Sequence, residues 1–300
     1  MEHKLAPAFF WPINSTIVRP LQRAAAASVQ RLMVRAAWRL APRHATERAV
    51  SAMLTPPAHA FPDEELLLME YASQVRVALG RRHLVGWRWG RRRDPVVLVV
   101  HGWGGRGTQF RHFVAPLRAA GFAVVSFDAP GHRMSGDGVS SLHEFVRALD
   151  AMLDHLGPVH ALVGHSMGAA AAALVMARRS HEVGRGVLIA PPASLEQSTR
   201  RIANALGWPG GMQEAVLGAI ERQVGVPIGL FEAARHVGPQ PLLLIHDRQD
   251  REVPFADGMR YVQTWPGARL LATEGLGHRR ILAAPAVLDA TADFLAGSRP

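Results

Sequence analysis

The sequence predicts an α/β protein with a mostly parallel, doubly wound sheet, a small helical cap and an N-terminal helical extension. Short apolar runs alternate with helical stretches from about residue 95 onward, and this alternation is typical of parallel strands covered by helices on both faces. One run leads directly into the pentapeptide Gly164–Gly168, which fits the pattern G-x-S-x-G and precedes an alanine-rich helical stretch. A basic, helix-prone segment precedes the alternating part.

The composition is that of a globular protein. Of the 300 residues, 48% are hydrophobic and 19% are charged, both near globular averages, and this length suffices for one large domain plus an extension. We expect a basic helical extension over residues 1–60 and a main domain over 61–300, with a cap insertion at about 194–238. The absence of cysteine excludes disulfides, a thiol nucleophile and cysteine-ligated metal sites.

The individual elements follow from local patterns. Ser73–Leu79 and His83–Trp89 predict an opening hairpin. After it, apolar runs predict strands and longer periodic stretches predict helices. The predicted strands are 95–100, 122–127, 159–163, 187–190, 241–245 and 269–273, and the predicted helices outside the cap are 109–119, 142–156, 167–179 and 283–295.

Ser166 stands at the centre of the pentapeptide, where a strand turns abruptly into a helix. A side chain at either Gly164 or Gly168 would block the tight turn that lifts the Ser166 hydroxyl clear of the backbone. The helix that follows would direct its N-terminal amides at a developing oxyanion. The pattern favours a nucleophile elbow over the alternative, a glycine-rich turn with no catalytic role.

A serine nucleophile requires a base that takes its proton and an acid that orients the base. The run that ends near residue 245 opens into an acidic loop with Asp247, Asp250 and Glu252, and His278 follows the next predicted strand on a glycine-flexed loop. Functional groups of open α/β sheets gather at such strand ends. The order serine, acid, histidine is the one used by hydrolases that have a nucleophile elbow.

Together these motifs resemble the α/β-hydrolase family, over about residues 95 to 280. The resemblance implies Ser166 as nucleophile, His278 as general base and acid, and Asp250 as the orienting carboxylate. It also implies an oxyanion hole from the backbone N–H groups of Trp103 and Met167. The matching segments are His101–Gly105 after a valine-rich strand, Asp128–His132 after the next strand, the elbow, the Asp250 loop ending in Val253-Pro254, and Gly277-His278.

Three carboxylates compete for the role of the acid. In the family, the acid lies a few residues past the strand end and before the Val-Pro pair, which favours Asp250 over Asp247 and Glu252. Asp247 would then support or cap the loop. The segment after the preceding strand offers Glu196 but no aspartate, so the other acid position seen in some hydrolases is empty.

The chain has fifteen histidines, so a histidine alone carries little information. His278 is the one with the right place in the order of motifs. We expect His101 to brace the oxyanion loop, His132 to belong to a turn, and His165 to point away from the site.

The sequence also contains a pattern typical of nucleotide-binding proteins. Gly102, Gly104 and Gly107 fit the dinucleotide pattern G-x-G-x-x-G after a strand, and Asp128 follows at about the distance of a ribose-binding acid. This interpretation leaves the elbow, the acidic loop and the Gly-His turn unexplained. There is also no Gly-Lys-Ser or Gly-Lys-Thr of a P-loop and no H-E-x-x-H zinc motif.

The formal net charge of +10 is concentrated at the N-terminal end: residues 1–60 hold eight basic and two acidic residues. Several arginines recur every fourth residue and therefore lie along one side of a helix, with a break expected at Pro42. Two interpretations remain open. The helix lies on a membrane surface or docks a partner, or it packs its Ala/Leu/Trp side on the hydrolase core and exposes its arginines, which we favour.

From these features we expect a serine esterase that cleaves small-molecule esters of short or medium acyl chains, with no metal or organic cofactor and no nucleic-acid partner. The alternatives are a lysophospholipase or lipase at an anionic membrane surface, and a ligand-binding protein without activity. An apolar stretch of the cap, Ile202–Met212, suggests an apolar pocket. No run approaches the roughly twenty apolar residues of a membrane span, and the first residues make a poor signal peptide, so a cytoplasmic location is expected.

Overall fold

The computed structural model describes residues 20–57 and 60–297, apart from the side chains of residues 20–27. Its centre is an eight-stranded sheet in the order β1-β2-β4-β3-β5-β6-β7-β8. The β1–β2 hairpin is antiparallel, β2 pairs antiparallel with β4, and all other neighbours are parallel. The strands are β1 Ser73–Leu79, β2 Arg82–Trp89, β3 Val96–Val100, β4 Ala123–Phe127, β5 Val159–His165, β6 Val183–Ile189, β7 Leu242–Asp247 and β8 Arg269–Thr273.

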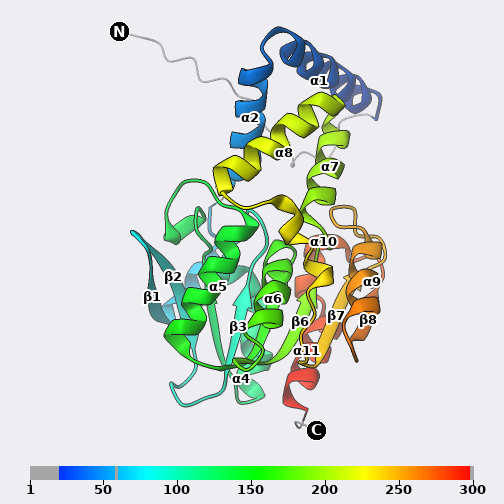
Figure 1. The fold of residues 1–300 in the computed structure, drawn as a ribbon. Helices are drawn as coiled ribbons and strands as arrows, with labels where there is room; N and C mark the ends of the chain where they lie inside the picture. The colour runs from blue at the N-terminus through cyan, green and yellow to red at the C-terminus, as the bar shows by residue number, and fades with distance from the viewer. Residues whose placement is uncertain (1–19, 58–59, 298–300) are drawn as a thin grey trace.

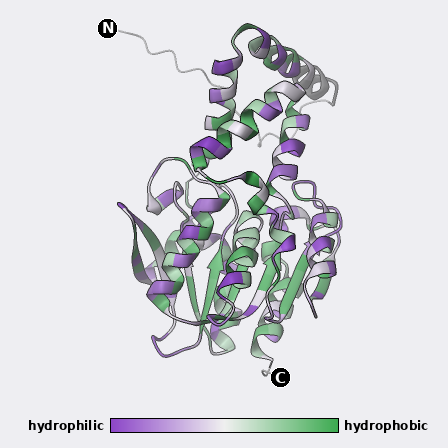
Figure 2. Cartoon of the chain, viewed as in Figure 1, coloured by the Kyte–Doolittle hydropathy of each residue, from purple (hydrophilic) through white to green (hydrophobic). Residues whose placement is uncertain are grey.

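Helices cover both faces of this sheet, which confirms the predicted fold class (Figure 1). The central strand β3 is buried on both sides: Leu98 and Val100 pack with α5, α6 and α9, whereas Val97 and Val99 pack with α4 and α11. Figure 2 shows the sheet as mostly hydrophobic strands between helices of mixed character. The covering helices are α4 Arg111–Ala119, α5 Leu142–Leu156, α6 Met167–Arg178, α9 Phe255–Thr264 and α11 Pro285–Ala296.

A layer of four further helices lies over one end of the sheet (Figure 1). The cap insertion supplies two of them, α7 (Leu195–Leu206) and α8 (Gly210–Val224), and the N-terminal segment supplies α1 (Pro20–Leu40) and α2 (Pro42–Leu54). The break between α1 and α2 falls at Ala41, and Pro42 is the first residue of α2. Proline has no N–H to donate to the carbonyl four residues earlier, so α1 ends before it, but it is tolerated in the first turn of a new helix. Among the described residues, none of the helices is both long enough and apolar enough to cross a membrane.

The N-terminal helices rest mainly on the cap helices rather than on the helices that cover the sheet. This differs from the arrangement we favoured from the sequence, in which the arm packs on the hydrolase core. Apolar side chains from both segments form one shared cluster, here called the cap cluster. Its buried members are Ala45, Ala49, Val50 and Leu54 of α2, Ala203 of α7, Trp208, and Met212, Val216 and Ile220 of α8.

A short helix that the sequence patterns did not predict, α3 (Asp63–Glu70), ties the segment after β3 to the rest of the protein. Its Glu65 is fully buried. The carboxylate accepts hydrogen bonds from Nε and Nη2 of Arg106, from the Thr108 hydroxyl at 2.5 Å and from Nη1 of Arg111 at 3.2 Å. Both Arg106 and Thr108 follow directly on the loop that begins at His101, so Glu65 holds the far end of that loop.

We expect the Glu65→Gln variant to lose about 3 kcal/mol of unfolding free energy, because it leaves the mostly buried Arg106 without its ionised partner. The neighbouring Glu64 is the matched control, since its side chain is 76% exposed and contacts only the edge of Arg111 at 3.3 Å. Glu64→Gln should change the unfolding free energy by less than about 1 kcal/mol. Urea unfolding of the two variants measures both values, and equal losses would contradict the assignment.

Candidate active site

Ser166 occupies a tight turn between the end of β5 and the start of α6. Its backbone has φ 53°, a left-handed conformation that residues other than glycine rarely adopt. The Ser166 N–H donates to the Ile189 carbonyl at 2.9 Å, and the Ser166 carbonyl accepts the amides of Ala169 and Ala170. Hydrogen bonds to the neighbouring strand and the following helix therefore hold the strained residue in place.

The glycines on either side of Ser166 permit this turn for a steric reason. A Cβ on Gly164 would lie 2.5 Å from the Cα of Ala169, and a Cβ on Gly168 would overlap the carbonyl oxygen of His101. Both approaches are far closer than van der Waals contact. The turn therefore brings α6 against its own strand and against the end of β3.

Asp250 and His278 meet beyond the ends of the last two strands. Asp250 follows β7 and His278 lies in α10 (Gly277–Arg280) after β8. Nδ1 of His278 donates to Oδ2 of Asp250 at 2.7 Å. The other carboxylate oxygen, Oδ1, accepts the backbone amides of Glu252 and Val253 at 2.8 and 2.9 Å. Both side chains are buried, so the pair is held in one geometry.

The Asp250 carboxylate stays ionised despite its burial. Burial raises the pKa of Asp250, but the imidazoles of His246 and His278 and the Val253 amide outweigh it and hold the pKa below its usual range. His246 was not singled out from the sequence. Its Nε2 donates to the Val253 carbonyl at 3.1 Å and lies 3.6 Å from Oδ2 of Asp250, so it braces the acidic loop.

The neighbouring carboxylates have other partners. Asp247 accepts the amides of Gln249 and Leu276, each at 3.0 Å, and the Thr273 hydroxyl at 2.9 Å. It therefore joins the loop after β7 to the loop that carries His278. Glu252 is exposed and pairs with Arg279 at 3.1 Å.

His278 is anchored to the elbow through His165, the residue before Ser166. Nε2 of His165 donates to the His278 backbone carbonyl at 2.8 Å, and the two rings lie 4.6 Å apart. In the described part of the chain, no hydrogen bond joins the Ser166 hydroxyl directly to His278. Such contacts often tighten only when substrate is bound.

The loop after β3 lies directly against the elbow. A Cβ on Gly102 would lie 2.9 Å from the Cβ of Ser166, which leaves room for glycine alone. His101 donates through Nδ1 to the Gly102 carbonyl at 2.7 Å and accepts the Ala129 amide at Nε2 at 2.9 Å. Nε2 of His132 accepts the Gly104 amide at 3.1 Å. Two imidazoles thus fix the loop that carries Trp103.

Trp103 and Met167 are both partly exposed. Trp103 follows Gly102 in the loop, and Met167 is the first residue of α6. Among residues 20–57 and 60–297, neither backbone N–H donates a hydrogen bond to another protein group. Both amides are therefore available to an acceptor beside Ser166.

Asp128 is buried directly after β4. In the nucleotide-binding interpretation its carboxylate would bind the ribose of a nucleotide. Its two oxygens instead accept the Gly107 amide at 2.8 Å and the Met134 amide at 3.0 Å. Burial raises the pKa of Asp128 to about 6. The carboxylate therefore joins the segment that contains Gly107 to the segment that contains Met134, and both of its oxygens are used in doing so.

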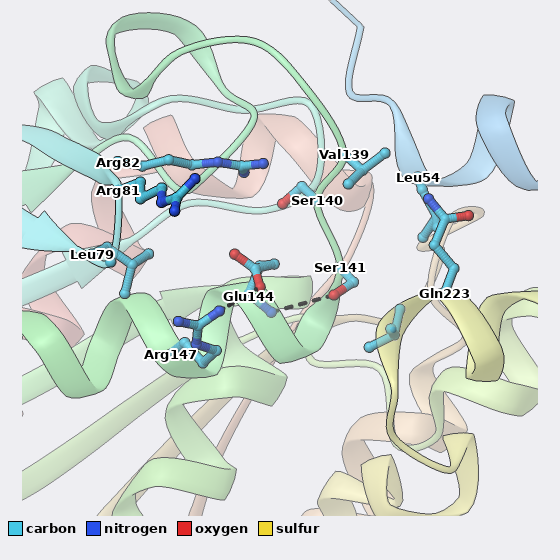
Figure 3. Close-up of a pocket in the computed structure, with 12 residues that line it drawn as sticks. Leu54, Leu79, Arg81, Arg82, Val139, Ser140, Ser141, Glu144, Arg147 and Gln223 are labelled. Carbon is cyan, nitrogen blue, oxygen red and sulfur yellow. Dashed lines mark hydrogen bonds and ion pairs between the residues drawn. The ribbon is translucent and has the colours of Figure 1, made fainter.

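A cavity of about 290 Å³ lies apart from Ser166, between the β1–β2 hairpin, the start of α5 and the ends of α2 and α8 (Figure 3). Arg81, Arg82 and Arg147 surround Glu144 there, and Arg147 donates to Glu144 at 3.1 Å. None of the three residues of the predicted triad lines it. Over the described ranges, no three carboxylate, imidazole or thiol groups gather as metal ligands would.

The buried histidines of the site make a prediction about acid stability. Burial lowers the pKa of His132 to about 4 and of His165 to about 3, from an ordinary 6.5, and it also lowers the pKa of His101 well below 6.5. Below pH 6.5 these imidazoles bind protons in the unfolded chain but remain neutral in the folded protein. The free energy of unfolding therefore falls as pH falls. Asp128 has the opposite effect on the free energy of unfolding. Its carboxyl group has a raised pKa in the folded protein and takes up a proton near pH 6, where the unfolded chain does not.

With three imidazoles against one carboxyl, acidification from pH 7 to pH 5 should lower the unfolding free energy by roughly 4 kcal/mol. Urea unfolding at the two pH values measures the difference. An unfolding free energy that is equal or higher at pH 5 would show that these histidines do not remain neutral in the folded protein.

Comparison with known proteins agrees with this architecture. The family described as alpha/beta hydrolase fold matches residues 95–231. Esterase YjfP of Escherichia coli strain K12 is 26% identical over 232 residues, which are 67% of this chain and 87% of that protein.

Solved structures match over more of the chain. The esterase Pf2001 of Pyrococcus furiosus aligns with a TM-score of 0.59 at 21% identity, over 80% of this chain and 98% of that one. Est1E of Butyrivibrio proteoclasticus aligns with a TM-score of 0.59 at 17% identity, over 74% and 97%. The strand order and these structural matches together show that the chain has the α/β-hydrolase fold.

Proposed function

We propose that this protein is a serine hydrolase that cleaves carboxylic esters of short or medium acyl chains through an acyl-enzyme intermediate. The observation that carries the proposal is the buried Asp250–His278 pair, at 2.7 Å, fastened through His165 to the strained turn of Ser166. A base that a carboxylate orients is the group that activates a serine hydroxyl. The E. coli relative and the structural neighbour from P. furiosus are named as esterases, which supports ester hydrolysis.

The mechanism assigns the proton transfers to His278. Because Nδ1 is engaged by Asp250, Nε2 is the nitrogen that can take the proton of the Ser166 hydroxyl as Oγ attacks the ester carbonyl carbon. The resulting imidazolium is stabilised by the ionised Asp250. It returns the proton to the departing alkoxide as the carbon–oxygen bond breaks. Water, deprotonated by the same Nε2, then cleaves the acyl-enzyme and restores Ser166.

The tetrahedral intermediate carries its negative charge on the former carbonyl oxygen. We assign its stabilisation to the N–H groups of Trp103 and Met167, which lie on the two segments that flank Ser166. Each such donor typically contributes roughly 3 kcal/mol to the transition state. The start of α6 adds the positive end of a helix dipole at the same place.

Part of the apolar cap stretch that the sequence assigns to an acyl pocket is packed inside the cap. The apolar stretch Ile202–Met212 was expected to line it, but Trp208 and Met212 are buried in the cap cluster. These two side chains are therefore unavailable to a substrate beside Ser166. A comparison of p-nitrophenyl esters of increasing chain length gives the acyl preference directly.

Substitution of each carboxylate in turn shows which of Asp250 and Glu252 acts as the catalytic acid. In Asp250→Asn the amide can still hold His278, but with the tautomer that leaves Nε2 protonated, and kcat should fall by about 10⁴-fold. Glu252→Gln is the matched control, because Glu252 lies two residues away, is exposed and contacts only Arg279. Its kcat should stay within about threefold of the wild type. Equal effects of the two substitutions would remove Asp250 from the assignment.

The nucleophile is tested by labelling and by turnover. A fluorophosphonate probe should modify Ser166, identified by mass spectrometry of the labelled peptide. Ser166→Ala should lose the label and at least about 10⁵-fold in kcat, with an unfolding free energy within about 1 kcal/mol of the wild type. Ser73→Ala, at an exposed serine of β1, should keep both label and turnover. A Ser166→Ala protein that still hydrolyses esters would sink the proposal.

A further inference from the structure

Helix α1 carries large apolar side chains on a side that no described part of the protein covers. Val29, Leu32, Met33 and Leu40 are 56%, 69%, 52% and 87% exposed. Their spacing of three, one and seven residues places all four on one side of the helix. We call these four residues the α1 stripe. Thirteen large apolar residues are exposed in the described chain, and four of them belong to this helix.

The α1 stripe is not the side by which α1 packs on the protein. Val34 and Trp38 perform that function, since they pack against the cap cluster, and a Cβ on Gly211 of α8 would lie 3.5 Å from the Trp38 ring. Helix α1 therefore has two apolar sides. One side packs against the cap cluster, and the other side is exposed. Helix α1 itself lies at the end of the molecule farthest from α11 (Figure 1).

A row of arginines runs along one flank of the α1 stripe. Arg31, Arg35 and Arg39 recur every fourth residue, and all three are exposed. Helix α1 contains no acidic residue. In the described ranges, no carboxylate forms an ion pair with any of the three. The positive charge of this row is thus not compensated by an ion pair within the described part of the protein.

We propose that α1 docks on the surface of an anionic lipid bilayer and holds the hydrolase there. A helix lying in the interface plane needs an apolar side to enter the boundary of the acyl chains and basic side chains to meet the lipid phosphates. The α1 stripe supplies the first requirement and the arginine row supplies the second. Helix α1 lies at one end of the molecule, together with α2 (Figure 1).

The docking of α1 is independent of the chemistry at Ser166, so it is tested by binding. The full-length protein is floated with vesicles of phosphatidylcholine alone and with vesicles of phosphatidylcholine and phosphatidylglycerol. We expect it to float with the mixed vesicles only, and to be released as salt concentration rises, because salt screens exposed charges. Absence of binding to the mixed vesicles at low salt would overturn the proposal.

Two double variants test the two sides of the surface separately. Leu32→Ser/Met33→Ser removes half of the α1 stripe without changing charge and should abolish flotation. Arg35→Glu/Arg39→Glu should weaken vesicle binding by at least about 25-fold, because each arginine near an anionic surface strengthens binding by roughly fivefold. Circular dichroism and thermal unfolding check that both variants fold.

A charge-matched control distinguishes binding through the surface of α1 from binding that depends only on the net charge of the protein. Arg92 and Arg93 lie in the exposed loop between β2 and β3, and Arg92→Glu/Arg93→Glu changes the net charge by the same amount as the α1 variant. The control should float like the wild type, and equal losses in both would contradict a role for α1. If analytical ultracentrifugation instead gives a dimer that Leu32→Ser/Met33→Ser dissociates, the stripe is an interface between copies and the membrane proposal is wrong.

Discussion

The backbone of Ser166 is the constraint on which the rest of the arrangement depends. A left-handed φ of 53° at a residue with a side chain is unfavourable by roughly 1–3 kcal/mol, and the fold retains it only because its surroundings leave no other path. Gly164 and Gly168 allow α6 to pass against β5 and the end of β3 at distances that any Cβ would forbid. The turn places Ser166 at the carboxyl end of β5, against the loop that follows β3.

The convergence of the other loops at the same edge of the sheet follows from the parallel strands. Strands β3, β4, β5, β7 and β8 run in one direction, so the loops after them emerge on the same side. Buried neutral imidazoles then fasten these loops to one another: His101 joins the loop after β3 to the one after β4, and His165 joins the elbow to the His278 segment. The same burial lowers the pKa of these imidazoles and makes the site sensitive to acid.

The sequence predicted the fold and the candidate site best where a residue's chemistry and the steric demands of its turn appear together in a short stretch of sequence. The strands, the glycines of the elbow and the acidic and histidine loops could be placed because each carries a local pattern. Glu65 could not, since a lone carboxylate in a short acidic helix gives no sign that it will be buried against Arg106, more than forty positions later. The packing of α2 on α8 was likewise hidden, because an apolar helical face does not specify which of several surfaces it covers.

The most direct test of the proposed active site is a crystal structure of the protein phosphonylated on Ser166. The phosphonyl oxygen that mimics the oxyanion should lie about 2.7–3.1 Å from the backbone nitrogens of Trp103 and Met167, with Nε2 of His278 facing the Ser166 oxygen. A structure in which that oxygen points to solvent, or in which His278 stays out of reach of Ser166, would contradict the account.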